Sequence, residues 1–206
     1  MYDCKYCYLK GAFKNETPVF FVNYEDMKAQ ILEVVQKREN NEVIRFYTSD
    51  YSDNLATDTL TNFTSEFFPF FDTLENVKME IRTKSTNIAN ILKMKPSKNI
   101  EIAFSLNPEE IISKYELKTP GLDARIAAIN TLIDAGWQVG VRFLPQLETK
   151  NYQDTYEWFL KYIVAKIDFH RVYSVFIGGL LYTKEDYNKI LKKEPYLDVL
   201  YSLEDS

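Results

Sequence analysis

Short apolar segments alternate with amphipathic segments along most of the chain. Five segments are rich in β-branched or aromatic residues and mostly bounded by polar or turn residues, which predicts buried strands at Val43–Thr48, Val77–Thr83, Ile100–Ser105, Gln138–Leu144 and Val172–Ile177. Apolar residues at helical spacing predict helices around residues 27–35, 55–67, 88–92, 126–133 and 156–163. The fourth helix is expected to end before Gly136 as a C′ glycine. Residues 182–206 have a polar, helical pattern.

This alternation predicts the fold class. Strands that alternate with helices indicate parallel strands joined by crossover helices, and therefore an α/β fold. The units are too few for an eight-stranded barrel, while an open partial barrel and a doubly wound sheet both fit the pattern. No repeat, low-complexity tract or linker divides the chain, so we expect residues 1–206 to form a single domain.

Composition and charge narrow the class of protein. The apolar fraction of 46% and charged fraction of 27% are ordinary for a soluble globular protein. The net charge of −5 argues against an overall basic nucleic-acid binder, but is compatible with a local basic groove. There is no apolar run of about 18 residues, no signal-peptide pattern and no cysteine framework typical of secretion. We therefore expect a cytoplasmic protein without a membrane partner.

Cys4 and Cys7 form a C-x-x-C pair, which is compatible with several kinds of chemistry. A redox dithiol needs a thiolate of low pKa, usually at a helix N-terminus. A zinc site needs two further Cys or His ligands, and the chain has one histidine, His170. An iron–sulfur cluster needs more thiolates than these two. The spacing alone leaves these possibilities open, beside two ordinary thiols near a terminus.

The residues around the cysteines are more specific. Cys4-Lys5-Tyr6-Cys7-Tyr8-Leu9 is similar to the end of a C-x-x-x-C-x-x-C motif. Two further segments, Arg82-Thr83-Lys84 and Ser105-Leu106-Asn107, each end a predicted strand. The second is followed by Tyr115-Glu116, Thr119 and Arg125-Ile126, and then by the next predicted strand, Val139-Gly140-Val141 through Pro145. Together they cover roughly residues 4–147, and their combination resembles the spore photoproduct lyase family of the radical S-adenosylmethionine (SAM) superfamily.

The resemblance implies a partial (β/α)6 TIM-like radical SAM barrel that lacks its first strand. The first motif cysteine would sit immediately before Met1, and the family has a longer C-terminal part, so we expect a fragment of a longer protein. Cys4 and Cys7 would be ligands of a 4Fe–4S cluster. Tyr6 would lie against the adenine of SAM, and Lys84 would reach its carboxylate.

Some of these positions also make physical sense without the family. Lys84, Ser105 and Arg142 lie at or near the C-terminal ends of predicted parallel strands, the rim where α/β barrels place their sites. Lys84 offers a positive charge for a carboxylate, and Ser105 and Asn107 offer hydrogen bonds to a nucleoside. We expect all four to bind the cofactor. Without the resemblance, a surface lysine and an Asn-Pro turn would explain the same residues.

The sequence departs from the family at one catalytic position. Aligned with the family, Asp50 stands where the lyase has the cysteine that acts as its final hydrogen donor. A carboxylate has no weak X–H bond to offer a carbon radical, so two alternatives stay open: the parent protein acts on a different substrate, or a tyrosine such as Tyr8 or Tyr51 is the hydrogen donor. The candidate catalytic residues are therefore Tyr8, Asp50 and Tyr51.

The function expected of the longer parent protein is that of a radical SAM enzyme resembling spore photoproduct lyase, a DNA-repair-type lyase. It would bind the cluster and SAM and generate a 5′-deoxyadenosyl radical. Its partners would be SAM, DNA as a possible substrate, and an external one-electron reductant such as flavodoxin or ferredoxin. The alternatives are a catalytically inactive α/β domain that binds a nucleotide or nucleic acid, and a C-x-x-C redox protein.

Overall fold

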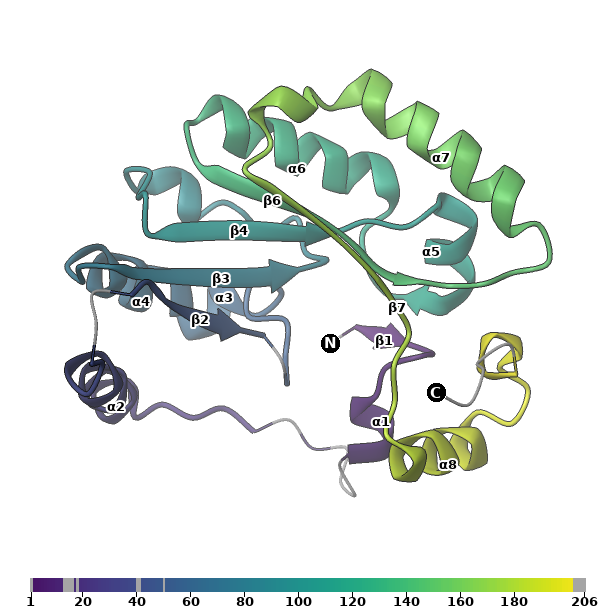
Figure 1. Ribbon diagram of the computed structural model, residues 1–206, viewed down its shortest axis with the longest axis horizontal. Helices are drawn as coiled ribbons and strands as arrows, with labels where there is room; N and C mark the ends of the chain where they lie inside the picture. Colours follow the sequence, from purple (N-terminus) through teal and green to yellow (C-terminus); the bar gives the residue numbers. More distant parts are fainter. Residues whose placement is uncertain (1, 13–16, 18, 40–41, 50, 202–206) are drawn as a thin grey trace.

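The computed structural model describes residues 2–12, 17, 19–39, 42–49 and 51–201 (Figure 1). Five parallel strands form one sheet in the order β2-β3-β4-β6-β7. Their bounds are Ile44–Thr48, Val77–Thr83, Ile100–Ser105, Gln138–Gln146 and Ser174–Gly179. Two very short strands, β1 (Asp3–Cys4) and β5 (Glu116–Leu117), pair antiparallel as a second sheet.

Helices connect the strands of the large sheet, and further helices precede its first strand and follow its last strand. They are α1 (Leu9–Ala12), α2 (Tyr24–Gln36), α3 (Asp58–Thr61), α4 (Phe63–Asp72), α5 (Glu109–Tyr115), α6 (Leu122–Asp134), α7 (Tyr152–Lys166) and α8 (Lys184–Lys193). In Figure 1, α6 and α7 lie on one side of the sheet, while β1, α1 and α8 lie on the other. Across the described residues, no helix has the length and apolar character needed to cross a bilayer.

The strand order shows which α/β architecture the chain adopts. The strands follow one another across the sheet in chain order, without the reversal that marks a doubly wound sheet. Figure 1 shows the sheet curling, with β7 crossing in front of β6. The expected partial TIM-like barrel is therefore confirmed.

One face of this curled sheet forms the core with the helices. Strand register places Ile81, Ile102 and Val139 in one row, and all three are fully buried. Aromatic pairs join the same face to the helical layer: Phe46 contacts Phe71 of α4 with ring centroids 5.5 Å apart, and Phe143 contacts Phe159 of α7 at 5.8 Å. Burial of these large apolar surfaces supplies the main driving force for folding.

The opposite, concave face is polar. Glu80 and Glu101 are neighbours across β3 and β4, and Arg142 of β6 reaches both carboxylates at 2.8 and 2.6 Å. All three side chains are nearly inaccessible to solvent. Buried charges are tolerated when they are paired and hydrogen-bonded, as here.

One predicted helix is wrong. The pattern over residues 55–67 predicts a continuous helix, but the chain breaks at Asn62, which has a left-handed φ of 52° between α3 and α4. The cause is Asp58, whose carboxylate accepts hydrogen bonds from the Thr64 N–H and hydroxyl at 2.8 and 2.7 Å and so starts a second helix. Leu60, expected on the apolar face, is exposed.

The bounds of the remaining elements lie close to those predicted from the sequence. β2 begins one residue late, β6 runs two residues further than predicted, and β7 is shifted by two residues. The segment 88–92 is a turn followed by a 3-10 helix, Ile91–Lys93. Gly136 has a φ of +89° beyond α6, which confirms it as the C′ glycine. Residues 182–201 contain α8 and the 3-10 turn Asp198–Leu200.

Candidate functional site

The cysteine loop is held against the rim of the barrel by the small sheet. Cys4 lies opposite Glu116 across β1 and β5, and the Lys5 N–H donates to the Tyr115 carbonyl at 2.7 Å. The Cys7 N–H donates to the Cys4 carbonyl at 3.1 Å, which closes the turn between the two thiols. Both cysteines are free and half-buried, so the loop presents two thiols from one tight turn.

Tyr6 lies between the cysteines and is buried, with 5% of its surface exposed. Its hydroxyl donates to the Glu116 carboxylate, and its carbonyl accepts from the Tyr182 hydroxyl. Burial, together with the nearby Glu116 charge, raises the pKa of Tyr6 well above its usual value, so the phenol keeps its proton. Hydrogen bonds therefore hold Tyr6 both at its phenol hydroxyl and at its backbone carbonyl.

Lys84 reaches this ring from the end of β3. Its Nζ lies 5.8 Å from the Tyr6 ring centroid. Asp53 secures the backbone beneath it by accepting from the Lys84 N–H at 2.8 Å and the Thr83 hydroxyl at 2.7 Å. Burial raises the pKa of the Cys4 thiol to about 11, although the Lys84 charge opposes this rise. The predicted neighbours Cys4, Tyr6 and Lys84 thus lie in one place.

Ser105 and Asn107, at the end of β4, are buried at the same rim. The Ser105 carbonyl accepts from Arg125 at 2.9 Å. The Asn107 amide donates to Glu116 at 2.9 Å, and its oxygen accepts from the Tyr156 hydroxyl at 3.3 Å. The Asn107 side chain is therefore occupied by internal hydrogen bonds at both of its polar atoms.

Arg142 lies in register with Ser105, but its guanidinium is directed into the concave wall of the barrel. Besides Glu80 and Glu101 it donates to the Ser174 hydroxyl at 2.8 Å. The side chain is 4% exposed. Its guanidinium is thus engaged by Glu80, Glu101 and Ser174 in the wall of the barrel.

The catalytic candidates lie further out. Tyr8 and Tyr51 make an edge-to-face contact with ring centroids 6.5 Å apart. Both rings are exposed, at 38% and 70% of their surfaces. Asp50 lies outside the described residues. The structure therefore brings together the two tyrosines proposed as alternative donors.

Two residues at the centre of the site had no role assigned from the sequence, Glu116 and Arg125. Both side chains are fully buried and form an ion pair at 2.6 Å. Burial opposes ionisation of Glu116, but Lys84, Arg125 and hydrogen bonds from Tyr6 and Asn107 together hold its pKa below the usual value. Both residues belong to the sequence segments that resemble the family, and this resemblance is the signal from which a role for them could have been predicted.

The described thiols form an incomplete set of cluster ligands. Within the described ranges, no group of three or more His, Cys, Asp or Glu side chains is placed to hold a metal ion. Cys4 and Cys7 are chemically suited to iron, since thiolates are the usual ligands of iron–sulfur clusters. The sequence contains these two cysteines and no third one that could complete a three-thiolate set.

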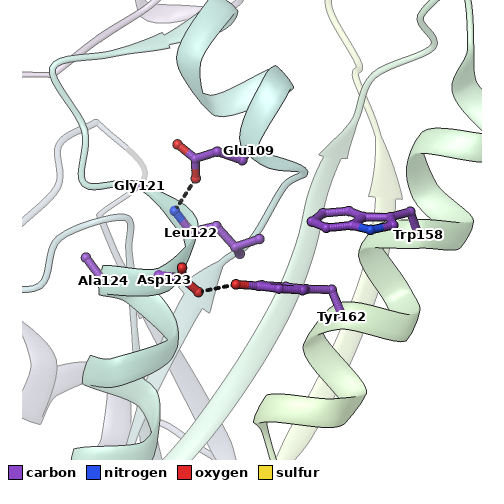
Figure 2. A pocket seen from close by; sticks show the side chains of 7 residues that line it. All are labelled: Glu109, Gly121, Leu122, Asp123, Ala124, Trp158 and Tyr162. Carbon is purple, nitrogen blue, oxygen red and sulfur yellow. Dashed lines mark hydrogen bonds between the residues drawn. The ribbon is translucent and has the colours of Figure 1, made fainter.

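A separate pocket of about 320 Å³ lies on the helical layer between α6 and α7 (Figure 2). The Glu109 carboxylate accepts from the Leu122 N–H at 2.6 Å and so caps the start of α6. Trp158 and Tyr162 stack at 4.8 Å, and the Tyr162 hydroxyl donates to Asp123 at 2.7 Å. None of the predicted site residues lines this pocket.

Comparison with known proteins identifies the family of this chain. A family model described as spore photoproduct lyase matches residues 1–197. The chain belongs to the spore photoproduct lyase family. Membership of this family places the chain in the radical SAM superfamily, which confirms the resemblance in the sequence.

Curated spore photoproduct lyases are similar over most of the chain. That of Clostridium acetobutylicum is 26% identical over 194 residues, which cover 93% of this chain and 57% of the relative. That of Bacillus subtilis is 26% identical over 169 residues, covering 82% of this chain and 48% of the relative. The chain thus spans about half the length of these relatives.

Solved structures of spore photoproduct lyase share the fold. A double mutant with bound AdoMet and dinucleoside spore photoproduct has a TM-score of 0.85 and 22% identity, covering 95% of this chain and 58% of the other. The lyase complexed with dinucleoside spore photoproduct has a TM-score of 0.82 and the same identity and coverage. At this level of identity the likeness establishes the partial barrel.

Proposed function

We propose that this chain is the barrel segment of a radical SAM lyase of the spore photoproduct lyase type. The observation that carries the proposal is the Tyr6–Lys84 pair beside the cysteine loop, with Nζ 5.8 Å from the ring centroid. An aromatic face suits an adenine, and a lysine ammonium suits the carboxylate of SAM. In the described part of the chain, Lys84 has no carboxylate at salt-bridge distance, so its charge is available.

The proposed cofactors are SAM and a 4Fe–4S cluster. Cys4 and Cys7 would provide two thiolates; residues 1–206 contain no other cysteine, so a third thiolate would come from another part of the protein. When bound, the cluster supplies one electron to cleave SAM to a 5′-deoxyadenosyl radical, and an external reductant such as flavodoxin or ferredoxin restores that electron. The chain's own residues orient SAM through Tyr6 and Lys84, with Ser105 and Asn107 shaping the rim beside them.

DNA carrying a thymine photoproduct is the proposed substrate class, because solved relatives bind a dinucleoside spore photoproduct. Tyr8 and Tyr51 are the proposed hydrogen donors in place of the cysteine. A phenol O–H gives up a hydrogen atom to a carbon radical and leaves a tyrosyl radical. Turnover of repair substrate by Tyr8→Phe and Tyr51→Phe variants tests this assignment. Unchanged turnover in both would remove the tyrosines from the mechanism.

The function is tested by completing the ligand set. A chain extended so that a cysteine immediately precedes Met1 is compared with one carrying a serine there, each reconstituted with iron and sulfide without oxygen. The cysteine version is expected to bind about four iron atoms per chain and, with dithionite, to produce 5′-deoxyadenosine from SAM. The serine version should do neither.

A failure would favour the alternative function. If the cysteine version binds no iron and cleaves no SAM, the chain is better described as an inactive nucleotide- or nucleic-acid-binding α/β domain. Filter binding of single- and double-stranded oligonucleotides would then measure that activity directly.

The role of Lys84 has a matched control in Lys78, which lies on β3, the strand that ends just before Lys84. Lys84→Met is expected to weaken SAM binding about tenfold or more, since a hydrogen bond to a charged group contributes about 1.5–3 kcal/mol. Lys78→Met changes the same residue type at the opposite end of β3 and should leave SAM affinity unaltered. Equal affinities for the two variants, measured by equilibrium dialysis, would contradict the assignment.

A further inference from the structure

The Glu116–Arg125 ion pair is buried at the centre of the rim, and its hydrogen bonds connect several elements. Arg125 donates to the Glu116 carboxylate at 2.6 Å and to the Thr119 hydroxyl at 2.7 Å. It also donates to the carbonyls of Ser105 and Pro120, each at 2.9 Å. One guanidinium of α6 therefore ties the end of β4 and the loop before α6 to a single carboxylate.

Glu116 in turn holds the cysteine loop in two independent ways. Its backbone pairs with Cys4 across β1 and β5. Its side chain accepts from the Tyr6 hydroxyl, two residues further along the same loop. Asn107 completes the carboxylate's partners by donating to Oε1 at 2.9 Å. The loop is thus fixed at Cys4 through main chain and at Tyr6 through side chain.

The position of Tyr6 matters because both thiols and the Lys84 ammonium are arranged around it. Turning the ring away from Glu116 would change its position relative to Lys84 Nζ, now 5.8 Å from the ring centroid. It would also pull on the turn in which the Cys7 N–H bonds the Cys4 carbonyl. Arg125 prevents such movement by keeping Glu116 in one place, since a buried carboxylate without its partner is strongly disfavoured.

We propose that Glu116, held by Arg125, is the positioning residue of the cysteine loop: it fixes Tyr6 and thereby the relative placement of Cys4, Cys7 and Lys84. Its significance for catalysis rests on the proposed function, but the positioning itself is a property of this chain without cofactor. Glu116 acts through Tyr6 and need not touch SAM or iron.

Hydrogen exchange of the chain without iron or SAM tests the proposal directly. Glu116→Gln removes the charge that Arg125 holds and weakens the acceptor of Tyr6. The peptide covering residues 2–9 is expected to exchange at least about tenfold faster than in the unaltered chain, which corresponds to 1.4 kcal/mol of local stability. The peptide covering β3, residues 77–83, should change by less than about threefold.

The matched control is Glu101→Gln, another buried carboxylate paired with an arginine, but in the concave wall. Its side chain is 5% exposed and bonds Arg142 at 2.6 Å. This variant should accelerate exchange in β6 and β7 and leave residues 2–9 protected. Equal acceleration of residues 2–9 by both variants would mean that Glu116 contributes to overall stability alone, and would overturn the proposal.

A second variant covers the case in which Glu116→Gln does not fold. Tyr6→Phe deletes the phenol hydroxyl and leaves the Glu116–Arg125 pair in place, and it should also accelerate exchange of residues 2–9, by about threefold or more. No acceleration in a folded Tyr6→Phe chain would overturn the proposal. Because neither iron nor SAM is present, this result is independent of the iron and SAM measurements that test the proposed function.

Discussion

Gly140 offers the sharpest test of the concave charge network. A Cβ placed on Gly140 would lie 2.7 Å from Arg142 Nη1, 3.1 Å from its Cζ, and closer still to the Glu101 carboxylate. Real Cβ atoms do not approach heavy atoms so closely, so the ion pair would have to move. Both side chains are buried, at 4% and 5% exposure, and water has little access to the separated charges.

The size of the effect follows from two opposing contributions. Breaking a buried ion pair so that its charges lose their partners costs about 3–5 kcal/mol. Replacing glycine by alanine restricts the unfolded chain and returns about 0.4–1 kcal/mol. We therefore expect Gly140→Ala to lower the free energy of unfolding by about 2–4 kcal/mol, which for a chain of this size lowers Tm by about 4–16 °C.

Gly179→Ala is the control, because a Cβ there meets nothing within 4 Å in the same sheet. Urea unfolding followed by circular dichroism gives the free energy of unfolding for both variants from midpoint and slope. A Gly140→Ala variant within about 0.5 kcal/mol of the control would show that the ion pair relaxes freely. The argument for a tightly packed charged wall would then be wrong.

Three further outcomes are expected from the same structure. Asp58→Ala should cost about 2–4 kcal/mol in urea unfolding, because it leaves buried donors without their acceptor; a loss below about 1 kcal/mol would contradict this. Burial opposes ionisation of Glu80, but Arg142 and Arg82 hold the pKa of Glu80 below its ordinary value of 4.5. The ionised carboxylate therefore adds to the free energy of unfolding above pH 4.5, and this stabilisation is lost as the pH falls through the pKa that Glu80 has in the folded state. Glu80→Gln should therefore flatten the decline in stability below pH 4.5, and an unaltered decline would refute it. Asp53→Ala should raise hydrogen exchange in residues 51–57, since that carboxylate fastens the loop to the end of β3; unchanged exchange would show other restraints to be sufficient.

The sheet could be predicted from the sequence because each strand carries its own signal. β4 illustrates this: Ile100, Ile102 and Phe104 alternate with smaller or polar residues and all face the helices. The helix over 55–67 was mispredicted because its apolar spacing is continuous across Asn62. The break depends on a hydrogen bond from Thr64 to Asp58, which periodicity does not register.

The spatial arrangement of the candidate site could be predicted only where a local sequence signal marks each residue. A local motif singles out Tyr6 and a strand end singles out Lys84, and the fold brings the two together; their role in binding the cofactor stays a prediction. Arg142 was expected to bind the cofactor from the rim. The carboxylates that engage it lie 62 and 41 positions away in sequence, and only strand register reveals that they are neighbours.

Two arginine–carboxylate networks lie on the concave side of the barrel. In the wall, Arg142 pairs with Glu80 and Glu101, and Arg82 pairs with Glu80. Arg45 and Lys78, which are register partners on the same face of β2 and β3, add two further positive charges near the starts of these strands. At the rim, Arg125 balances Glu116, and the Lys84 ammonium is left over beside Tyr6. Because no carboxylate among the described residues lies at salt-bridge distance from Lys84, its ammonium is the charge that would attract an anionic group to the part of the rim beside Tyr6. Under the proposed function that group is the carboxylate of SAM, and its binding at Lys84 would bring the cofactor next to the two thiols that are proposed to hold the cluster.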